Sequence, residues 1–249
     1  MRPVAVFIFV MALFAGAPAY AWHDATHMAI VKAAGLDDYV YLAVGADMAR
    51  EKAGGHEDGN HYCNNLRGAV VTADMVLDQV RDYDCRCNGG GHLYGAIIAA
   101  LDQYRERTLS GRYGRYPLGF AMHYIGDLSM PLHNVEFNDF NKTWHSANDG
   151  VVEGNGFEPT DARVARIAAR IRAKMESVPP VRLPPAKADA AKFKRALAQK
   201  IAESANRSIA IGYAMQDSKP QRTIMTRDEA YRQLAESAAL LKAVYGALQ

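Results

Sequence analysis

Histidine and aspartate recur at a metal-binding spacing within one short stretch of the chain. His123 and Asp127 form one His-x-x-x-Asp pair, His145 and Asp149 form a second, and His133 lies between them. On an α-helix, residues four apart lie on one face, so each pair can direct both side chains at one ion. Imidazole nitrogen and carboxylate oxygen suit zinc, and a catalytic zinc keeps one position open for water or substrate. Two pairs and a fifth candidate exceed the ligands of one such zinc, so the spacing predicts a metal cluster.

The residues around these pairs favour the same interpretation. Gly126 has no side chain beside Asp127, so another segment can approach closely. Pro131 ends a helix just before His133, which can then turn back toward the first pair. A single His-x-x-x-Asp pair is more often a hydrogen-bonded couple on the surface, but two pairs with a histidine between them favour a metal site.

The start of the chain has the pattern of a secretory signal peptide. Within residues 1–21, Arg2 precedes an apolar run, and the segment ends in Ala19-Tyr20-Ala21. This is the order of charged region, apolar region and small-residue cleavage site. The apolar run is too short to indicate a transmembrane span, and no later stretch approaches one. We therefore expect residues 22–249 to form an exported protein, periplasmic or secreted, that begins at Trp22.

Cleavage at that bond would free the α-amino group of Trp22. A neutral amine and the neighbouring carbonyl oxygen can chelate one ion in a five-membered ring, and His27 follows five residues later. By spacing alone, a histidine near an N-terminus is usually a solvated residue, so this ligand set needs further support.

Several short motifs occur in an order that is seen in one known superfamily. They are Trp22, His27, Ala46-Asp47-x-x-Arg50, Asn60-His61-Tyr62, His123-x-x-Gly126-Asp127, Pro131-Leu132-His133 and His145-x-x-x-Asp149. The chain resembles the superfamily of zinc-dependent phospholipases C and single-strand-specific nucleases, the latter also called S-one/P-one type nucleases. The resemblance covers residues 22–153 and returns more weakly in residues 203–206 and 231–248.

This resemblance implies an all-α, single-domain fold that holds three zinc ions at the bottom of a cleft. One ion of a close pair would be held by Asp47, His61, His123 and Asp127. Its neighbour would be held by the amino and carbonyl groups of Trp22, by His27 and by a bridging Asp127. The third ion would be held by His133, His145 and Asp149.

The implied reaction is hydrolysis of a phosphodiester by water that zinc activates. Zinc lowers the pKa of bound water toward ~7, so a nucleophile is available near neutral pH. The resemblance also implies a second role for Asp47, near the attacking water. Arg50 lies on the same helical face and could hold a phosphate oxygen, although an exposed helical arginine is an equally common finding. Tyr62 would stack on a base of the substrate, or it packs in the core.

Two substrate classes stay open. The short spacing from Trp22 to His27, an aspartate at Asp149, the Asp47-x-x-Arg50 motif and the ring of Tyr62 favour a single-strand nuclease for DNA or RNA. Removal of a 3′ phosphate from nucleotides would be a further activity. The short loop before His145 and the run over residues 134–138 favour a zinc phospholipase C acting on phosphatidylcholine-like lipids.

A third hypothesis is a zinc-binding protein without catalysis, which the complete ligand set argues against. The formal net charge of +2 does not distinguish nucleic acid from a zwitterionic headgroup as the partner. We expect a monomer without a membrane span.

The apolar periodicity is helical almost throughout, which predicts an all-α fold. The predicted helices cover residues 25–34, 69–80, 93–104, 118–126, 162–175, 190–211 and 226–248. Thr226 and Glu229 form a capping box at the start of the last one. Two Pro-Pro pairs within residues 179–185 mark a connector, or a loop on the rim of the cleft.

The cysteines and the remaining histidines add little to the site. Export favours disulfides, and three cysteines permit one bridge and leave one thiol. Cys63 bonded to Cys85 or to Cys87 would tie the segment after His61 to the glycine-rich loop that follows. We expect ordinary surface or loop positions for His23, His56 and His92.

Overall fold

The computed structural model describes residues 22–52, 55–86, 89–154 and 158–249. These residues form α-helices and short 3-10 helices without a strand, which confirms the all-α prediction. The α-helices are α1 (Asp24–Ala33), α2 (Gly45–Lys52), α3 (Ala73–Asp78), α4 (Leu93–Leu109), α5 (Arg115–Leu128), α6 (Asp139–Asp149), α7 (Asp161–Met175), α8 (Ala190–Asp217) and α9 (Arg227–Leu248). The 3-10 helices are η1 (Asp37–Val44), η2 (Asp58–Asn60), η3 (Gln79–Asp82) and η4 (Pro131–His133). The predicted signal peptide lies outside the described residues.

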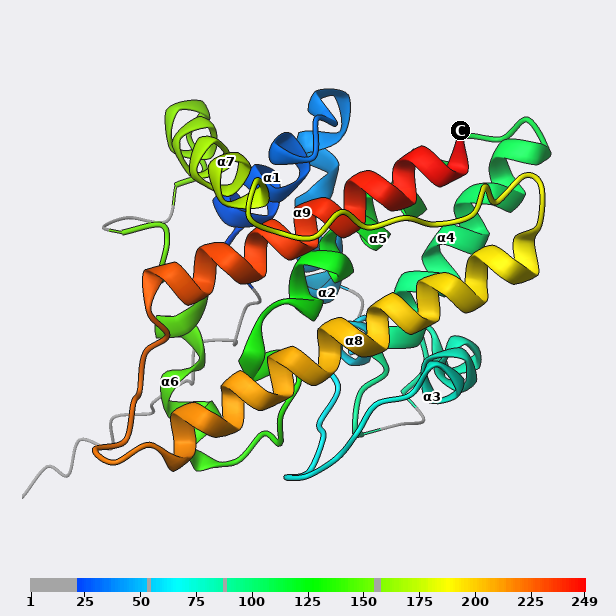
Figure 1. Cartoon of the computed structure of the whole chain (residues 1–249). Helices are drawn as coiled ribbons and strands as arrows, with labels where there is room; N and C mark the ends of the chain where they lie inside the picture. The colour runs from blue at the N-terminus through cyan, green and yellow to red at the C-terminus, as the bar shows by residue number, and fades with distance from the viewer. Residues whose placement is uncertain (1–21, 53–54, 87–88, 155–157) are drawn as a thin grey trace, which may run out of the picture.

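Helix α5 is the centre of the fold. It contacts α1, α2, α4, α8 and α9, and its residues from Pro117 to Leu128 are buried except for Phe120. The long helices α8 and α9 cross the view in gold and red, with α5 and α4 beside them (Figure 1). A helix that is apolar on nearly all sides needs partners on nearly all sides. The first His-x-x-x-Asp pair lies on this helix and is therefore surrounded by protein.

Local sequence signals set several helix starts. Thr226 and Glu229 form the predicted capping box at the start of α9, with both reciprocal hydrogen bonds present. The side chain of Asn138 accepts a hydrogen bond from the backbone N–H of Asn141 at the start of α6. Pro131 begins η4 directly after α5, so His133 turns back under the helix that carries His123.

The predicted helix over residues 69–80 is only partly correct. Residues before Thr72 form a loop in which Val70 is exposed, and α3 begins where the Thr72 side chain caps the backbone N–H of Met75. The helix gives way to η3 after Asp78. Periodicity alone did not separate a short capped helix from the extended segment before it. It also did not predict α2 or α6, and it ended α4, α5 and α8 too early.

The proline-rich connector before α8 does not line the cavity beside His61, His133 and His145. Val178, Pro179 and Val181 instead line a separate hollow against Ser204 of α8 and Leu240 of α9. In the described part of the chain, no helix has the length and apolar character that crossing a membrane requires.

Candidate metal centre

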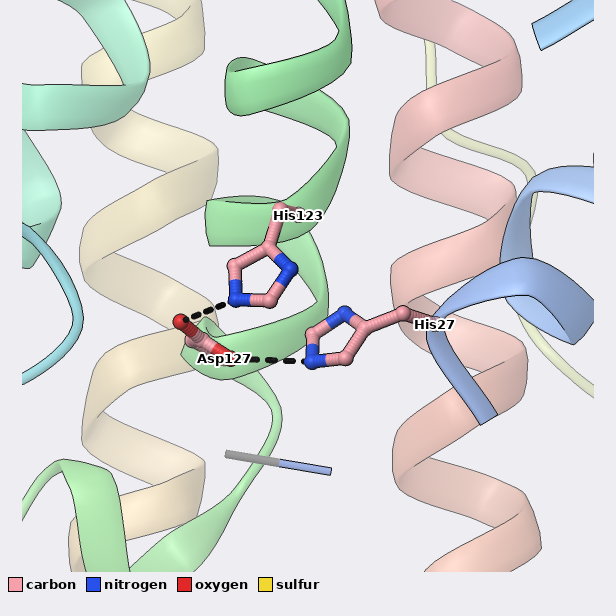
Figure 2. Close-up of side chains that lie close together, drawn as sticks. All are labelled: His27, His123 and Asp127. Carbon is pink, nitrogen blue, oxygen red and sulfur yellow. Dashed lines mark ion pairs between the residues drawn. The ribbon is translucent and has the colours of Figure 1, made fainter. Parts of the chain in front are cut away.

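Asp127 is the point at which three histidines from different elements meet. Its Oδ1 lies 3.3 Å from Nε2 of His27 on α1. Its Oδ2 lies 3.0 Å from Nδ1 of His61 and 3.3 Å from Nε2 of His123, one turn earlier on α5. Figure 2 shows the carboxylate between the rings of His27 and His123, with one oxygen directed at each. One carboxylate therefore has an oxygen available on each side for an ion.

The ring of His27 reaches this position because Gly126 precedes Asp127. A Cβ atom at Gly126 would lie 2.6 Å from Nδ1 of His27, a distance that real Cβ atoms essentially never show. Without it, the His27 ring stacks on that of His123, with 3.8 Å between centroids. The glycine in the motif is thus a steric requirement for the approach of α1, although it admits a ring and not a backbone.

A second set of side chains adjoins the first and shares His123. Oδ1 of Asp47, in the first turn of α2, lies 3.6 Å from Nε2 of His123 and 3.7 Å from Nδ1 of His61. Asp47, His61 and His123 form one group that could hold a metal ion, and His27, His123 and Asp127 form another. The two groups share His123, whereas the resemblance implies that Asp127 is the shared ligand; Asp127 lies within 3.3 Å of His27, His61 and His123, so its bridging role stays a prediction.

The third group lies on the other side of His61. His133, His145 and Asp149 place one ligand atom each within 4.8 Å of one another, and all three are buried. The imidazole of His145 lies 3.6 Å from Asp149, one turn later on α6. A hydrogen bond of 2.5 Å joins Nδ1 of His133 to the carbonyl oxygen of His61, which couples this group to the other two.

The donor set fits a metal because its ligand atoms are buried without other partners. Several of these buried atoms make no hydrogen bond: Nε2 of His133, Nε2 of His145, Oδ1 of Asp127, and both carboxylate oxygens of Asp47 and of Asp149. Leaving a buried polar atom unpaired costs roughly 1–3 kcal/mol each, and more for charged groups. Unpaired imidazole nitrogens and carboxylate oxygens that converge in this way suit divalent metals.

The opposite nitrogens of these rings are held by fixed acceptors. Nδ1 of His123 donates to the carbonyl oxygen of Ala43 at 2.7 Å, and Nδ1 of His145 donates to Oδ1 of Asn141 at 2.6 Å. Together with the His133 contact, these bonds select, for each ring in its neutral form, the tautomer that leaves Nε2 bare. Outer partners of this kind orient metal-ligating histidines.

Burial and charge set the protonation states in the two halves of the centre. Burial lowers the pKa of His133 to about 4 and that of His145 well below its usual range, so both rings are neutral near pH 7. Burial would also lower the pKa of His123, but Asp127 and Asp47 raise it to about 9. Conversely, burial would raise the pKa of Asp127, yet His123 and the other imidazoles hold it well below its usual range.

A cavity of about 300 Å³ opens next to the centre. Its lining includes three of the candidate ligand residues, His61, His133 and His145, together with Arg50, Asp58, Tyr62 and Phe137. Nε of Arg50 lies 3.0 Å from Oδ1 of Asp58, which holds the guanidinium at the wall. Tyr62 is partly buried and Phe137 is 45% exposed, so aromatic surface is available beside the metal ligands.

Trp22 lies next to the C-terminal end of α5, although the amino group of its proposed ligand pair is created only by cleavage. The side chain is buried, and its indole N–H donates to Oγ of Ser129 at 3.2 Å. Ser129 follows Asp127 by two residues, so the first described residue of the chain is anchored beside the shared carboxylate. The role of Trp22 as a ligand stays a prediction.

Four residues that the sequence analysis did not single out take part in the site. Glu57 lies 3.7 Å from Nε2 of His61. Glu153 accepts hydrogen bonds from the backbone N–H and the hydroxyl of Thr26, at the start of α1. Glu57-x-x-x-His61 and Asp149-x-x-x-Glu153 repeat the four-residue spacing of the ligand pairs. This spacing is the sequence feature that could have indicated Glu57 and Glu153. Phe137 and Asp58 gave no such signal.

Two expectations from the sequence are wrong. Cys63 is a buried free thiol whereas Cys85 is disulfide-bonded, so Cys63 does not form the bridge. His92 is fully buried, and its Nε2 lies 2.9 Å from Oδ1 of Asn60. Its place at the start of α4, under η2, explains why a histidine near a glycine-rich loop is not a surface residue.

No protein-family model matches the chain, and no curated protein matches it. The fold class and the three groups of buried histidine and aspartate therefore rest on the geometry above.

Proposed function

We propose that the chain is an exported zinc-dependent phosphodiesterase of the phospholipase C and single-strand nuclease type. The observation that carries the proposal is the convergence of three histidine and aspartate groups, with unpaired ligand atoms, beside one cavity. The ordered motifs of the sequence support the same type. The signal-peptide pattern of residues 1–21 supports export to the periplasm or secretion.

Three zinc ions are the cofactors that this proposal requires. Bound zinc polarises a phosphoryl oxygen and supplies a nucleophilic water near neutral pH. Asp47, His61, His123 and Asp127 would hold one ion, Trp22, His27 and Asp127 its neighbour, and His133, His145 and Asp149 the third. The neutral state of His133 and His145 removes competition from protons at these two side chains, whereas burial raises the pKa of Asp149 well above its usual range and favours the protonated acid there until a metal binds.

The side chains of the cavity would bind and orient the substrate. Arg50 presents a guanidinium that can donate two parallel hydrogen bonds to two non-bridging phosphate oxygens. Asp47 faces the cluster from α2 and can accept a proton from the attacking water. Tyr62 and Phe137 offer two rings, and stacking on such rings is worth roughly 1–3 kcal/mol per base. Single-stranded DNA or RNA is the substrate that this combination favours.

A phospholipase C is the second candidate, and Asp58 favours it. This carboxylate lines the cavity together with the rings of Tyr62 and Phe137, and its side chain is 48% exposed. A carboxylate beside aromatic rings is suited to a quaternary ammonium headgroup. Since Asp58 is paired with Arg50, its charge is already partly neutralised, which places the lipid second.

The test is a paired assay on protein that begins at Trp22. Zinc per chain is measured by elemental analysis, and hydrolysis of single-stranded DNA, RNA and phosphatidylcholine is followed side by side. About three zinc ions with cleavage of nucleic acid is the expected result. Cleavage of lipid alone would transfer the protein to the second candidate, and zinc below two per chain without hydrolysis would refute the metal centre.

A further inference from the structure

His61 has an unusual orientation among the ligand residues. Its Nδ1 faces the cluster, 3.0 Å from Asp127 and 3.2 Å from Nε2 of His123. Its Nε2 faces away from the cluster and is buried without a hydrogen-bond partner. If Nδ1 is the ligand atom, the ring proton must be on Nε2, and a buried N–H needs an acceptor.

Glu57 supplies a carboxylate on that outer side. Its Oε1 lies 3.7 Å from Nε2 of His61, and its side chain is 6% exposed. The hydroxyl of Tyr124 donates to the same oxygen, and Nδ2 of Asn60 donates to Oε2 at 2.9 Å. Both oxygens are therefore held in place, and Oε1 is directed at the ring of His61.

Further hydrogen bonds fix the two groups that hold Glu57. Asn60 donates to Oδ1 of Asp84 at 2.8 Å, and its own Oδ1 accepts from the backbone N–H of Asp84 at 3.2 Å. Nε2 of His92 lies 2.9 Å from the same Oδ1. Tyr124 follows His123 on α5, and its ring meets that of His61 edge to face at 5.5 Å between centroids. These contacts fix Asn60 and Tyr124, and with them the carboxylate of Glu57 beside His61.

We infer that Glu57 is a positioning residue for the metal centre: its carboxylate accepts the Nε2 proton of His61 and so directs Nδ1 at the paired metal positions. The inference rests on the proposed zinc centre and extends it to a residue outside the ligand set. It also assigns a function to the buried network of Asn60, Tyr124 and His92. Without Glu57, the ring of His61 is free to place its proton on Nδ1 or to rotate.

The test compares Glu57→Gln and Tyr124→Phe with the unaltered protein. The carboxylate has two acceptor oxygens, one for Asn60 and one for Tyr124 and His61. Glutamine has a single acceptor oxygen, so it cannot accept hydrogen bonds on both sides. Tyr124→Phe removes only the hydroxyl that holds Oε1. Glu236→Gln is the control, because Glu236 of α9 pairs with Arg207 of α8 and forms no ion pair with an imidazole among the described residues.

Two measurements that do not depend on substrate distinguish the outcomes. The first is zinc affinity by competition with a chromophoric chelator, together with zinc per chain. The second is the nitrogen NMR spectrum of the histidine rings in the zinc-loaded protein, which identifies the protonated nitrogen of His61. We expect a zinc affinity 10- to 100-fold weaker at the paired positions in Glu57→Gln, and a smaller loss in Tyr124→Phe. The third zinc and the control variant should be unaffected.

Each alternative outcome has a separate meaning. Full zinc affinity and an unchanged His61 spectrum in Glu57→Gln would overturn the inference alone and leave the proposed function intact. If Glu57→Gln fails to fold, as circular dichroism would show, normal zinc binding by Tyr124→Phe would overturn it. An unaltered protein that binds no zinc would overturn the proposed function and this inference together.

Discussion

The rings of His27 and His123 stack face to face, with 3.8 Å between centroids and 13° between planes. The two residues come from α1 and α5, and Asp127 accepts a contact from each. Gly126 makes the stack sterically feasible, since any side chain there would meet the His27 ring. The position of α1 is therefore coupled to the proposed metal centre through one glycine.

Gly126→Ala should disrupt the paired metal positions. The added Cβ would lie 2.6 Å from Nδ1 and 2.8 Å from Cε1 of His27, so the ring has to move. We expect the loss of one zinc per chain and a decrease of roughly 1–3 kcal/mol in the free energy of unfolding, measured with denaturant. Gly246→Ala is the control, because a Cβ there meets no atom within 4 Å, and helix propensity predicts a gain of about 0.5–1 kcal/mol.

Asp127→Asn should remove more metal than Asp149→Asn. Nitrogen atoms of three histidines lie within 3.3 Å of Asp127, whereas the described imidazole in ion-pair contact with Asp149 is that of His145, at 3.6 Å. We expect the first variant to lose the paired zinc ions and nearly all activity. The second should lose one zinc and keep the pair. Equal activity losses with full zinc content in both variants would contradict a bridging role for Asp127.

An extra residue before Trp22 should cost one zinc. The buried indole holds Trp22 beside the end of α5, so a short extension would replace the α-amino group by a peptide N–H without moving the ring. A peptide nitrogen does not chelate zinc as a neutral amine does. The comparison is between protein that begins at Trp22 and protein with one added glycine, by elemental analysis and hydrolysis rate. Equal zinc content in the two forms would show that the N-terminus is not a ligand.

Glu153→Gln should change how stability depends on pH in chelator-treated protein. Burial raises the pKa of Glu153 from 4.5 to about 7, although its hydrogen bonds to Thr26 act in the opposite direction. Between these values the folded protein holds a proton that the unfolded chain has lost. The contribution to stability is thus complete below pH 4.5 and is lost as the pH rises through about 7.

The expected size follows from the shift in the pKa of Glu153. Each unit corresponds to about 1.4 kcal/mol, so the unaltered protein should lose on the order of 3 kcal/mol more than the variant between pH 5 and pH 8. The measurement is denaturant unfolding of both proteins across this range. Parallel curves would show that Glu153 titrates alike in the folded and unfolded states.

The sequence was informative where function depends on local spacing. The pairs His123 with Asp127 and His145 with Asp149 are four residues apart, so an α-helix alone places their side chains together. The all-α class followed in the same way from periodicity. The ligand sets that combine different elements came from resemblance, because no local rule brings His27 to Asp127.

What the sequence did not predict depends on long-range packing. His92 is buried because η2 lies over the start of α4, and nothing near His92 in the chain indicates this. The contact of Glu57 with His61 depends on a 3-10 turn between them, so a four-residue spacing in a loop had no obvious meaning. The pairing of Arg50 with Asp58 likewise joins α2 to the following loop.

Substitutions in the cavity should distinguish nucleic acid from lipid. Tyr62 and Phe137 both line it, but Tyr62 directly follows the ligand residue His61, whereas Phe137 lies near His145, with 6.4 Å between centroids. If bases stack on Tyr62, Tyr62→Leu should lower kcat/KM for single-stranded DNA by about 5- to 150-fold, since stacking is worth roughly 1–3 kcal/mol. Tyr62→Phe keeps the ring and should keep most of the activity.

For a quaternary ammonium substrate, Asp58→Asn should be the more damaging change. Asp58 is the one carboxylate among the described residues that line the cavity. The ratio of the two losses, measured on DNA and on phosphatidylcholine with zinc content held constant, therefore reports which ligand the cavity binds.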